Sequence, residues 1–411
     1  MRNTGKNSGP GSKKFSLINQ GCRLNAAESQ KIAEELQKRG WVLSSPQQAL
    51  WVIVNTCTVT HRADADLRKI IRRVKRENPG AKIAAIGCYV DHYGKVEGAD
   101  LALPNHRKTE IINLLGAEGK GKPVRWKSRG FLKVQEGCDL ACTYCIIPRV
   151  RGPSRSLPWS LIERRIEEFL SLGYQEVVIT GIHLESYGRE WGEREGLLHL
   201  LRLLEKFYPQ IKFRISSLDP RFLSSRLLDY ILNSPHIMPT FHLSLQHYSP
   251  RILKLMGRGS NRGFARLVDK IRKGRPEAGL GADFIVGFPS ETDEDFLLLY
   301  RFAEKAPLSY FHVFTFSPRE RTRAAEIRPR VPERISKKRS ALLRELGRRK
   351  TGEFARSMVG KTLQATVIKE GEALSENYLR IKFEGKLPPG KRLPFKIEDF
   401  AAPWLLGKPL V

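Results

Sequence analysis

The residues with the clearest chemical potential are cysteines. Three of them lie in one eight-residue stretch, Cys138-Asp-Leu-Ala-Cys142-Thr-Tyr-Cys145. Three thiolates at this spacing can bind three irons of a [4Fe–4S] cluster. Because no fourth cysteine lies nearby, the fourth iron would stay open for a small ligand. The alternative is a structural zinc site, which needs four ligands and would have to recruit a histidine such as His183 or His242.

The other three cysteines, Cys22, Cys57 and Cys88, are widely spaced in the sequence. Each follows a short apolar run that predicts a β-strand, over residues 15–19, 51–54 and 82–86. Since neighbouring parallel strands end at the same edge of a sheet, the three thiolates can converge there. This predicts a second three-thiolate site with an open iron. The alternative is three buried cysteines that act as small apolar side chains.

The elements that must position these cysteines alternate along the chain. Helical patterns over residues 28–39 and 65–77 separate the first three strands, which predicts a parallel sheet with right-handed crossovers. This α/β domain spans residues 15–117. We expect a basic disordered tail over 1–14 and a Gly- and Lys-rich linker over 118–130.

A longer alternation of strands and helices follows from residue 131 to residue 358. It predicts a partial (β/α)6 barrel, whose functional residues belong at the carboxyl ends of its strands. The predicted strands span residues 131–135, 176–180, 212–217, 241–246, 282–286 and 311–316. The 138–145 cysteine stretch comes directly after the first of them. A long basic helix over 333–356 precedes a small β-domain at 359–411.

Composition narrows the function classes. The 411 residues allow two or three domains, because single cores rarely exceed roughly 250–300 residues. There are 72 Lys and Arg against 43 Asp and Glu, so the net charge is +29. This excess favours a polyanionic partner, with nucleic acid first and an anionic membrane surface second, although solubility alone can also explain it. Six cysteines are too few for a disulfide scaffold of this length. With no apolar leader or membrane-length apolar run, we expect a soluble cytoplasmic protein.

The Cys-x3-Cys-x2-Cys stretch resembles the signature of radical S-adenosylmethionine (SAM) enzymes. That resemblance implies that the amino and carboxylate groups of SAM chelate the open iron. It further implies that one-electron reduction cleaves the sulfonium and releases a 5′-deoxyadenosyl radical. Cys138, Cys142 and Cys145 would then be catalytic as well as metal-binding residues.

Both cysteine groups together resemble the methylthiotransferase family over nearly the whole chain. The N-terminal segments that carry the resemblance are Gly21-Cys22-Arg-Leu-Asn25, Asn55-Thr-Cys57-Thr-Val and Gly87-Cys88-Tyr-Val. The core continues it in Cys145-Ile-Ile-Pro-Arg-Val-Arg151-Gly152. The C-terminal residues resemble a TRAM domain, a small RNA-binding β-barrel, although they are few. The implied fold is an N-terminal parallel α/β domain, a radical SAM barrel and a short TRAM-like domain.

The family has three branches, and this chain most resembles the MtaB type. The resemblance rests on Cys57-Thr-Val-Thr, the basic helix 68–76 and Thr180-Gly-Ile-His183. It implies a transferase that methylthiolates carbon 2 of N6-threonylcarbamoyladenosine at position 37 of tRNA. The other branches act on isopentenyladenosine in tRNA and on an aspartate of a ribosomal protein. A non-catalytic iron–sulfur RNA-binding protein is the alternative from another class.

The family resemblance also implies a division of labour between two [4Fe–4S] clusters. The Cys138/Cys142/Cys145 cluster would generate the radical that removes hydrogen from carbon 2. The cluster on Cys22, Cys57 and Cys88 would carry the sulfur, and a second SAM would donate the methyl group. The implied partners are tRNA, an electron donor such as a flavodoxin or ferredoxin, and a sulfur donor. No membrane is implied.

Further site candidates surround the cysteines. Tyr144 lies where the superfamily usually has an aromatic residue against the cofactor adenine, although ordinary loop packing is the alternative. Four residues at strand ends are candidates for cofactor binding, with structural roles as the alternative: Gly181, Ser216, Gln246 and Gly287. Three arginines after the cysteine loop could hold tRNA phosphates or form a solvated basic loop: Arg149, Arg151 and Arg155.

Some positions depart from the family pattern. Ser290 and Arg321 stand where members usually have glycine, and His247-Tyr248 stands where they usually have Ser-Gly. These loops should lie at the mouth of the barrel. The departures leave the cysteines untouched, but they weaken what the resemblance implies about substrate choice and some cofactor contacts.

Overall fold

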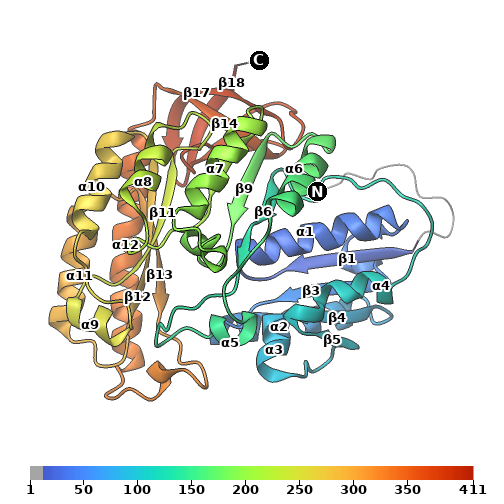
Figure 1. The fold of residues 1–411 in the computed structure, drawn as a ribbon, viewed down its shortest axis with the longest axis horizontal. Coiled ribbons are helices and arrows are strands. Elements are labelled where there is room, and N and C mark those ends of the chain that lie inside the picture. The colour runs from blue at the N-terminus through green and yellow to red at the C-terminus, as the bar shows by residue number, and fades with distance from the viewer. Residues whose placement is uncertain (1–12, 411) are drawn as a thin grey trace. The chain divides into compact units, whose positions relative to one another are not determined.

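The computed structural model describes residues 13–410 and divides them into two compact units (Figure 1). The N-terminal unit holds the chain up to Trp126 together with Ile146–Pro153. The core unit holds Lys127–Cys145 and the chain from Ser154 onward. Residues 1–12 of the expected tail lie outside the described residues, and Lys14 already begins the first strand. The sequence predicts a single boundary between the two units at residues 118–130. The structure differs from this at Ile146–Pro153, which the prediction places in the core and the structure places in the N-terminal unit.

A five-stranded parallel sheet of order β2-β1-β3-β4-β5 organises the N-terminal unit. Its strands are β1 (Lys14–Asn19), β2 (Val42–Leu43), β3 (Trp51–Thr56), β4 (Lys82–Gly87) and β5 (Leu101–Leu103). The three long central strands were predicted from their apolar runs. The two edge strands were missed, because two or three residues are too few to show a strand pattern.

Helices cover both faces of this sheet. They are α1 (Arg23–Lys38), α2 (His61–Glu77), α3 (Cys88–Tyr93) and α4 (Ile111–Leu114), with 3-10 turns at Pro46–Gln48 and Asn105–Glu110. Because side chains alternate along a strand, Ile53 of β3 packs with Ile32 of α1, while Val52 packs with Leu67 and Ile71 of α2. The sheet is buried on both sides, as expected of a parallel α/β domain.

The core unit contains the predicted partial barrel of six parallel strands. They form two three-stranded sheets, β10-β9-β6 and β11-β12-β13, which are linked by the isolated bridges Phe213–Ile237 and Leu218–Leu243. The strands are β6 (Gly130–Lys133), β9 (Glu176–Thr180), β10 (Lys212–Ile215), β11 (Thr240–Gln246), β12 (Gly279–Val286) and β13 (Tyr310–Thr315). A short antiparallel pair, β7 (Gln135–Glu136) and β8 (Arg155–Ser156), flanks the cysteine loop.

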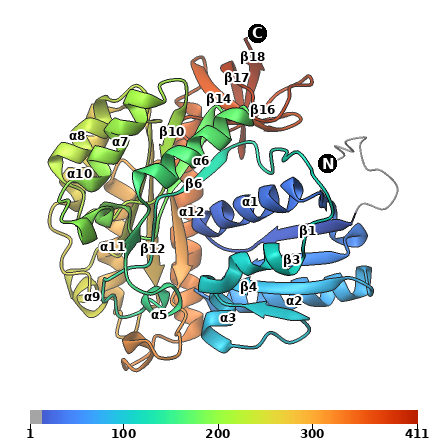
Figure 2. The same ribbon diagram turned by 45° about the vertical axis from the view of Figure 1, so that its right-hand side comes forward.

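Amphipathic helices lie outside these strands, as Figure 2 shows for α7, α8 and α10. The helices of the core unit are α6 (Trp159–Ser171), α7 (Gly196–Phe207), α8 (Ser225–Asn233), α9 (Pro250–Leu255), α10 (Phe264–Gly274), α11 (Asp293–Lys305) and α12 (Glu333–Arg356). The 3-10 turns are Leu184–Ser186, Arg189–Trp191 and Arg323–Ala325. One continuous apolar cluster fills the space between helices and strands. The short helix α5 (Ile147–Arg151) belongs to the N-terminal unit.

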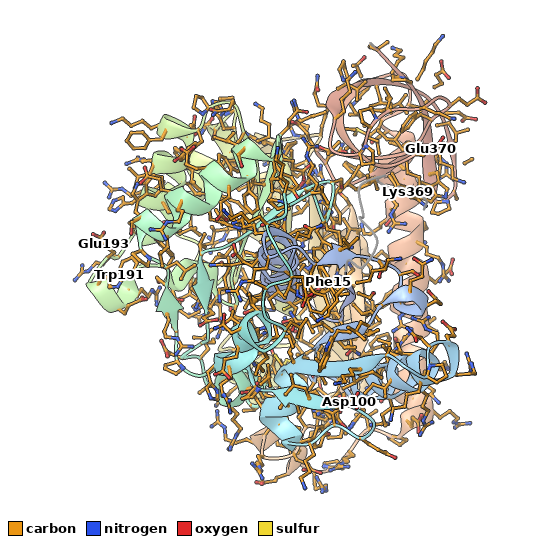
Figure 3. All side chains as sticks on the ribbon, turned by 90° about the vertical axis from the view of Figure 1, so that its right-hand side faces the viewer. Phe15, Asp100, Trp191, Glu193, Lys369 and Glu370 are labelled. Atoms are coloured by element: carbon orange, nitrogen blue, oxygen red, sulfur yellow. The ribbon has the colours of Figure 1, made fainter. Side chains whose placement is uncertain are left out.

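A small closed barrel completes the core unit. Its strands are β14 (Thr362–Lys369), β15 (Glu372–Ser375), β16 (Arg380–Lys382), β17 (Arg392–Ala401) and β18 (Trp404–Pro409). Figure 3 labels Lys369 and Glu370 at the turn between β14 and β15. The small barrel is anchored by the fully buried Arg214 of β10, which donates to the backbone of Ser375 and Glu376. The predicted C-terminal β-domain is therefore present and tied to the core strands. None of the helices in residues 13–410 is long and apolar enough to cross a membrane.

Candidate functional site

The N-terminal cysteines lie at one edge of their sheet. Cys57 directly follows β3, Cys88 directly follows β4, and Cys22 comes three residues after β1. These three strands are adjacent and parallel, so their carboxyl ends share an edge. Gly21 has a φ of +103°, and a Cβ at Gly21 would lie 2.7 Å from the Cβ of Cys57. The glycine therefore lets the Cys22 loop approach Cys57 closely.

Two asparagines hold this edge together. Asn25 Nδ2 donates to the carbonyls of Gln20 and Thr56 at 2.8 Å each, which joins the loops after β1 and β3. The Oδ1 of Asn25 lies 3.8 Å from Cys22 Sγ. Asn105 Nδ2 lies 3.4 Å from Cys88 Sγ and thus can donate to the sulfur. Side-chain amides consequently contact two of the three sulfurs.

The environments of Cys22 and Cys57 disfavour the charged form of their thiols. Burial raises the pKa of the Cys22 thiol, and burial together with the neighbouring Cys22 and Cys88 raises the pKa of the Cys57 thiol to about 12. A metal binds the thiolate, so loading of this site must release protons and supply compensating positive charge.

Positive charge at this edge comes from Arg151, which the structure places differently from the sequence prediction. Its side chain is only 2% exposed, and Nη1 pairs with Glu28 Oε1 at 3.0 Å. It does not face solvent, so it is not presented to an RNA phosphate in this structure. Arg149 and Arg155 are exposed, and Arg155 pairs with Glu136 at 2.9 Å. For these two, phosphate binding stays a prediction.

The core cysteines occupy one loop after β7, and distant segments brace that loop. Thr143 donates through its backbone N to the carbonyl of Met256 at 3.0 Å and through Oγ1 to the carbonyl of Leu255 at 2.8 Å. The backbone N of Ala324 donates to the carbonyl of Thr143 at 2.9 Å. Gly257 has a φ of +70°, and a Cβ there would lie 3.0 Å from the carbonyl oxygen of Ala141.

A buried arginine also accompanies this second cysteine group. Arg258 Nη1 lies 3.8 Å from Cys142 Sγ, and Nη2 donates to Asp219 Oδ2 at 3.0 Å. The side chains of Arg258 and Asp219 are 4% and 8% exposed. Sequence reasoning missed Arg258, because no local pattern relates it to a cysteine more than a hundred residues earlier.

Buried polar atoms at the carboxyl ends of β9 and β10 fit a polar ligand. Within residues 13–410, Ser216 Oγ, Glu185 Oε2 and His183 Nε2 are buried and have no hydrogen-bond partner, and the last two atoms lie 3.7 Å from each other. Burial raises the pKa of Glu185 to about 8 and lowers the pKa of His183 to about 4. Both groups are therefore mainly neutral at pH 7. Such unsatisfied atoms suit the ribose, amino or carboxylate groups of a bound cofactor.

The structure gives local reasons for the other predicted cofactor residues. A Cβ at Gly287 would lie 2.2 Å from Ser336 Oγ, and one at Gly181 would lie 2.9 Å from Gln135 Oε1. Gly287, which also has a φ of +72°, is thus needed for packing, whereas the atoms nearest to Gly181 are the ends of side chains. Tyr144 meets the ring of Phe288 edge-on, with centroids 6.4 Å apart. Gln246 ends β11 with a φ of +69°, a strained conformation for a residue with a side chain. Cofactor contact by these four stays a prediction.

The spacing of the sulfurs is unlike that of a single-ion site. Among the described residues, the one group of three ligand atoms within 4.8 Å of one another is His242, Asp283 and His312. A zinc ion about 2.3 Å from each thiolate would hold three sulfurs within about 4 Å of one another. Within the part of the chain that the structure describes, neither cysteine triad is gathered so tightly. His242 hydrogen-bonds to Asp283 at 2.8 Å.

The departures from the family pattern have clear structural consequences. Ser290 and Arg321 both have positive φ, at +67° and +65°, which explains why glycine is usual there. His247 is fully buried and its Nδ1 accepts a hydrogen bond from the backbone N of Ser249. Tyr248 stacks on Phe302 with the ring centroids 3.8 Å apart. His247 is therefore packed inside the unit, while Tyr248 is half-buried against its core.

A partial barrel whose first strands lead into a three-cysteine loop defines a radical SAM enzyme. The model of the radical SAM superfamily matches residues 132–303, and that of "Uncharacterized protein family UPF0004" matches residues 14–101. A radical SAM methyltransferase, TsrM from Kitasatospora setae, has a similar fold. Its TM-score is 0.53 at 12% identity, covering 74% of this chain and 73% of that one.

Sequence relatives narrow the class further. The threonylcarbamoyladenosine tRNA methylthiotransferase MtaB of Aquifex aeolicus is 38% identical over 398 residues, which cover 90% of this chain and 97% of the relative. The ribosomal protein uS12 methylthiotransferase RimO of the same organism is 31% identical, covering 86% of this chain and 84% of the relative. The chain belongs to the radical SAM methylthiotransferases, a family of transferases, and is most similar to their MtaB-type members.

Proposed function

We propose that this enzyme methylthiolates carbon 2 of N6-threonylcarbamoyladenosine at position 37 of tRNA. The observation that carries the proposal is the presence of two separate cysteine triads, which use all six cysteines of the chain. A non-catalytic RNA-binding protein would have no need for two incomplete ligand sets. A methylthiotransferase needs both, because radical formation and sulfur supply are different tasks.

In the core unit, Cys138, Cys142 and Cys145 would hold a [4Fe–4S] cluster to which SAM binds. SAM and the cluster would supply a radical that can remove hydrogen from carbon 2, a position that no ordinary base deprotonates. The buried Ser216 Oγ and Glu185 Oε2 are available to hydrogen-bond the cofactor. The bonds from Thr143 to the chain near Met256 keep the cysteine loop in place.

In the N-terminal unit, Cys22, Cys57 and Cys88 would hold a second [4Fe–4S] cluster that carries the sulfur. Asn105 Nδ2 can donate a hydrogen bond to Cys88 Sγ, and such bonds tune the potential of an iron–sulfur centre. The exposed Cys22 and half-buried Cys57 leave one side of the site accessible to a substrate.

The helix α2 supports an RNA substrate. Arg68, Arg72 and Arg73 are exposed on it and have no ion-pair partner within the described residues. Unpaired arginines on one helix suit the phosphates of a tRNA stem. The greater identity to MtaB than to RimO of the same organism also favours the tRNA branch over a ribosomal-protein substrate. The reaction would further require a sulfur donor and an electron donor such as a flavodoxin or ferredoxin, in the cytoplasm where tRNA is modified.

Mass spectrometry of nucleosides from a deletion strain tests the proposal. We expect the methylthio form of threonylcarbamoyladenosine to disappear, the unthiolated form to accumulate, and the wild-type gene but not Cys57→Ala to restore it. An unchanged nucleoside profile would refute the proposal. Loss of the methylthio group from isopentenyladenosine, or from a ribosomal-protein aspartate, would move the enzyme to another branch. Restoration by Cys57→Ala would favour a non-catalytic role.

A further inference from the structure

The cysteine site of the N-terminal unit is completed by a segment that follows the other cysteine triad. Ile146–Pro153 begins directly after Cys145 in the sequence but belongs to the N-terminal unit. Ile146 and Val150 form one small buried cluster with Cys88. Asn105 Nδ2 lies 2.7 Å from the carbonyl oxygen of Val150 and 3.4 Å from Cys88 Sγ. This segment therefore forms a wall of the site that contains Cys88.

The same segment brings the guanidinium of Arg151 into this site. Nη1 lies 3.0 Å from Glu28 Oε1 and Nη2 lies 3.2 Å from Glu28 Oε2, a two-pronged ion pair. Nη2 also donates to Oδ1 of Asn25, the same oxygen that lies 3.8 Å from Cys22 Sγ. Arg151 thus fixes the residue that contacts one of the three sulfurs.

The charges around Arg151 match an anionic occupant. Glu28 also pairs with Lys108 Nζ at 2.7 Å, and the side chains of Arg151 and Lys108 are only 2% and 4% exposed. Both cations bind Glu28, and Asp91 is a second, half-buried carboxylate that accepts from the backbone N of Asn105. A buried cation is stabilised by each negative charge that lies beside it. Three thiolates with bound iron and sulfide would add negative charge to the site that Arg151 enters.

We propose that Arg151 is a positioning residue of the N-terminal cysteine site, where it orients Asn25 and supplies the positive charge that stabilises the assembled iron–sulfur cluster. The inference rests on the proposed function, because it assumes that Cys22, Cys57 and Cys88 bind a cluster. The residues that follow Cys145 would then serve the cysteine site of the N-terminal unit, although the cysteine triad that they follow in the sequence belongs to the core unit. It also replaces phosphate binding as the expected role of Arg151.

The test isolates the N-terminal cluster in the full chain by replacing Cys138, Cys142 and Cys145 with alanine. In this parent we measure iron per chain after anaerobic reconstitution and the midpoint potential of the cluster by electron paramagnetic resonance. For Arg151→Met we expect at least a two-fold loss of iron and a shift of the remaining cluster to a more negative potential. Arg151→Lys should restore most of the iron, because it keeps the charge.

Glu28→Gln distinguishes an electrostatic role of Arg151 from a merely structural one, through the sign of the shift in midpoint potential. Removing this carboxylate leaves more positive charge beside the cluster, so the potential should shift in the positive direction. The double variant Arg151→Met/Glu28→Gln should return the potential toward that of the parent and provides a second measurement if Arg151→Met folds poorly. Arg107→Met removes an exposed arginine that pairs with Glu110 in the same unit and should change neither readout.

The outcomes separate this inference from the proposed function. If the parent that lacks Cys138, Cys142 and Cys145 bound no iron, the proposal of a second cluster would be refuted, and this inference would be refuted with it. A parent that binds iron, with Arg151→Met unchanged in iron content and potential, would overturn the role of Arg151 alone. Shifts of the same sign in Arg151→Met and Glu28→Gln would also overturn it, since both changes would then act through general disruption.

Discussion

The two cysteine triads differ in how the chain assembles them. The core triad lies within eight residues of one loop, whereas the other runs from Cys22 to Cys88 and forms only when β1, β3 and β4 pair. Yet each has a buried arginine held by a carboxylate, Arg258 on Asp219 and Arg151 on Glu28. The comparison teaches that the spacing of the cysteines can differ widely between the two triads, while a buried arginine held by a carboxylate accompanies each of them.

The largest effect should come from removing one ligand from each triad. We expect Cys142→Ala to abolish formation of 5′-deoxyadenosine from SAM while iron remains bound in the N-terminal unit. Cys57→Ala should still form 5′-deoxyadenosine but yield no methylthiolated tRNA, because only the proposed sulfur-carrying site is damaged. Chromatography with mass spectrometry measures both products in one assay. If Cys142→Ala still cleaved SAM, the assignment of radical formation to the core triad would be wrong, and the other triad would have to perform it.

The sequence predicted the triads unequally, and for physical reasons. The core triad is visible in its spacing, and the other is visible because each cysteine follows a strand. The alternation of strands and helices also predicted the parallel sheet and the six-stranded partial barrel. The contacts of Arg151 could not be predicted, because its partner Glu28 lies 123 residues away and the arginines of a basic loop are usually exposed to solvent. The contacts of Arg258 and of the Asp283–His312 pair also join residues far apart in the sequence and were not predicted for the same reason.

The second prediction compares the basic helices of the two units. On α2, Arg68, Arg72 and Arg73 have no ion-pair partner among the described residues. On α12, three cations pair with carboxylates: Lys337 with Glu333, Arg348 with Glu345, and Arg349 with Glu304. Replacing the three α2 arginines with glutamine should weaken tRNA binding by roughly 10- to 100-fold and lower the salt slope by up to about 0.9 for each lost phosphate contact.

The matched control replaces the three paired cations of α12 with glutamine. It changes the net charge by the same amount, so a filter-binding titration separates local contact from overall charge. We expect the α12 variant to lose at most about two- to three-fold in affinity, because its cations are already engaged. Equal losses from both triple variants would mean that total charge, not the surface of α2, attracts the tRNA.

The third prediction contrasts two glutamates, one in each unit. Glu28 has two cationic partners, whereas Glu185 accepts a hydrogen bond from the backbone N of Asp219. Burial raises the pKa of Glu185 to about 8. The folded state therefore holds a proton that the unfolded chain releases near pH 4.5. The stability that the carboxyl contributes is full below that pH and is lost as the pH rises towards 8.

Glu185→Gln should remove this pH dependence, since an amide stays neutral throughout. Relative to the wild type, the variant should gain on the order of 2–4 kcal/mol of unfolding free energy between pH 5 and pH 9. Urea unfolding at pH 5, 7 and 9 measures the difference. A constant offset between the two proteins across this range would show that Glu185 is already ionised in the folded state.

The smallest predicted effect concerns backbone conformation near the two sites. The N-terminal loops use glycine at positive φ, with Gly21 at +103° and Gly87 at +99°, whereas the core unit places Ser290 and Arg321 at +67° and +65°. A residue with a Cβ is strained there by about 1 kcal/mol or more. We expect Arg321→Gly to raise the free energy of unfolding by about 0.5–1 kcal/mol, after the greater flexibility of glycine in the unfolded chain is subtracted.

Ser290→Gly should gain less than Arg321→Gly, because Ser290 Oγ donates a hydrogen bond to the carbonyl of Arg328 at 2.9 Å and glycine would lose it. Arg321→Ala serves as the control, since alanine removes the charge but keeps the Cβ that causes the strain. Urea unfolding should therefore show no gain for alanine. If alanine stabilised the protein as much as glycine, loss of a positive charge from a chain of net charge +29 would be the cause, and the backbone would not be strained at this position.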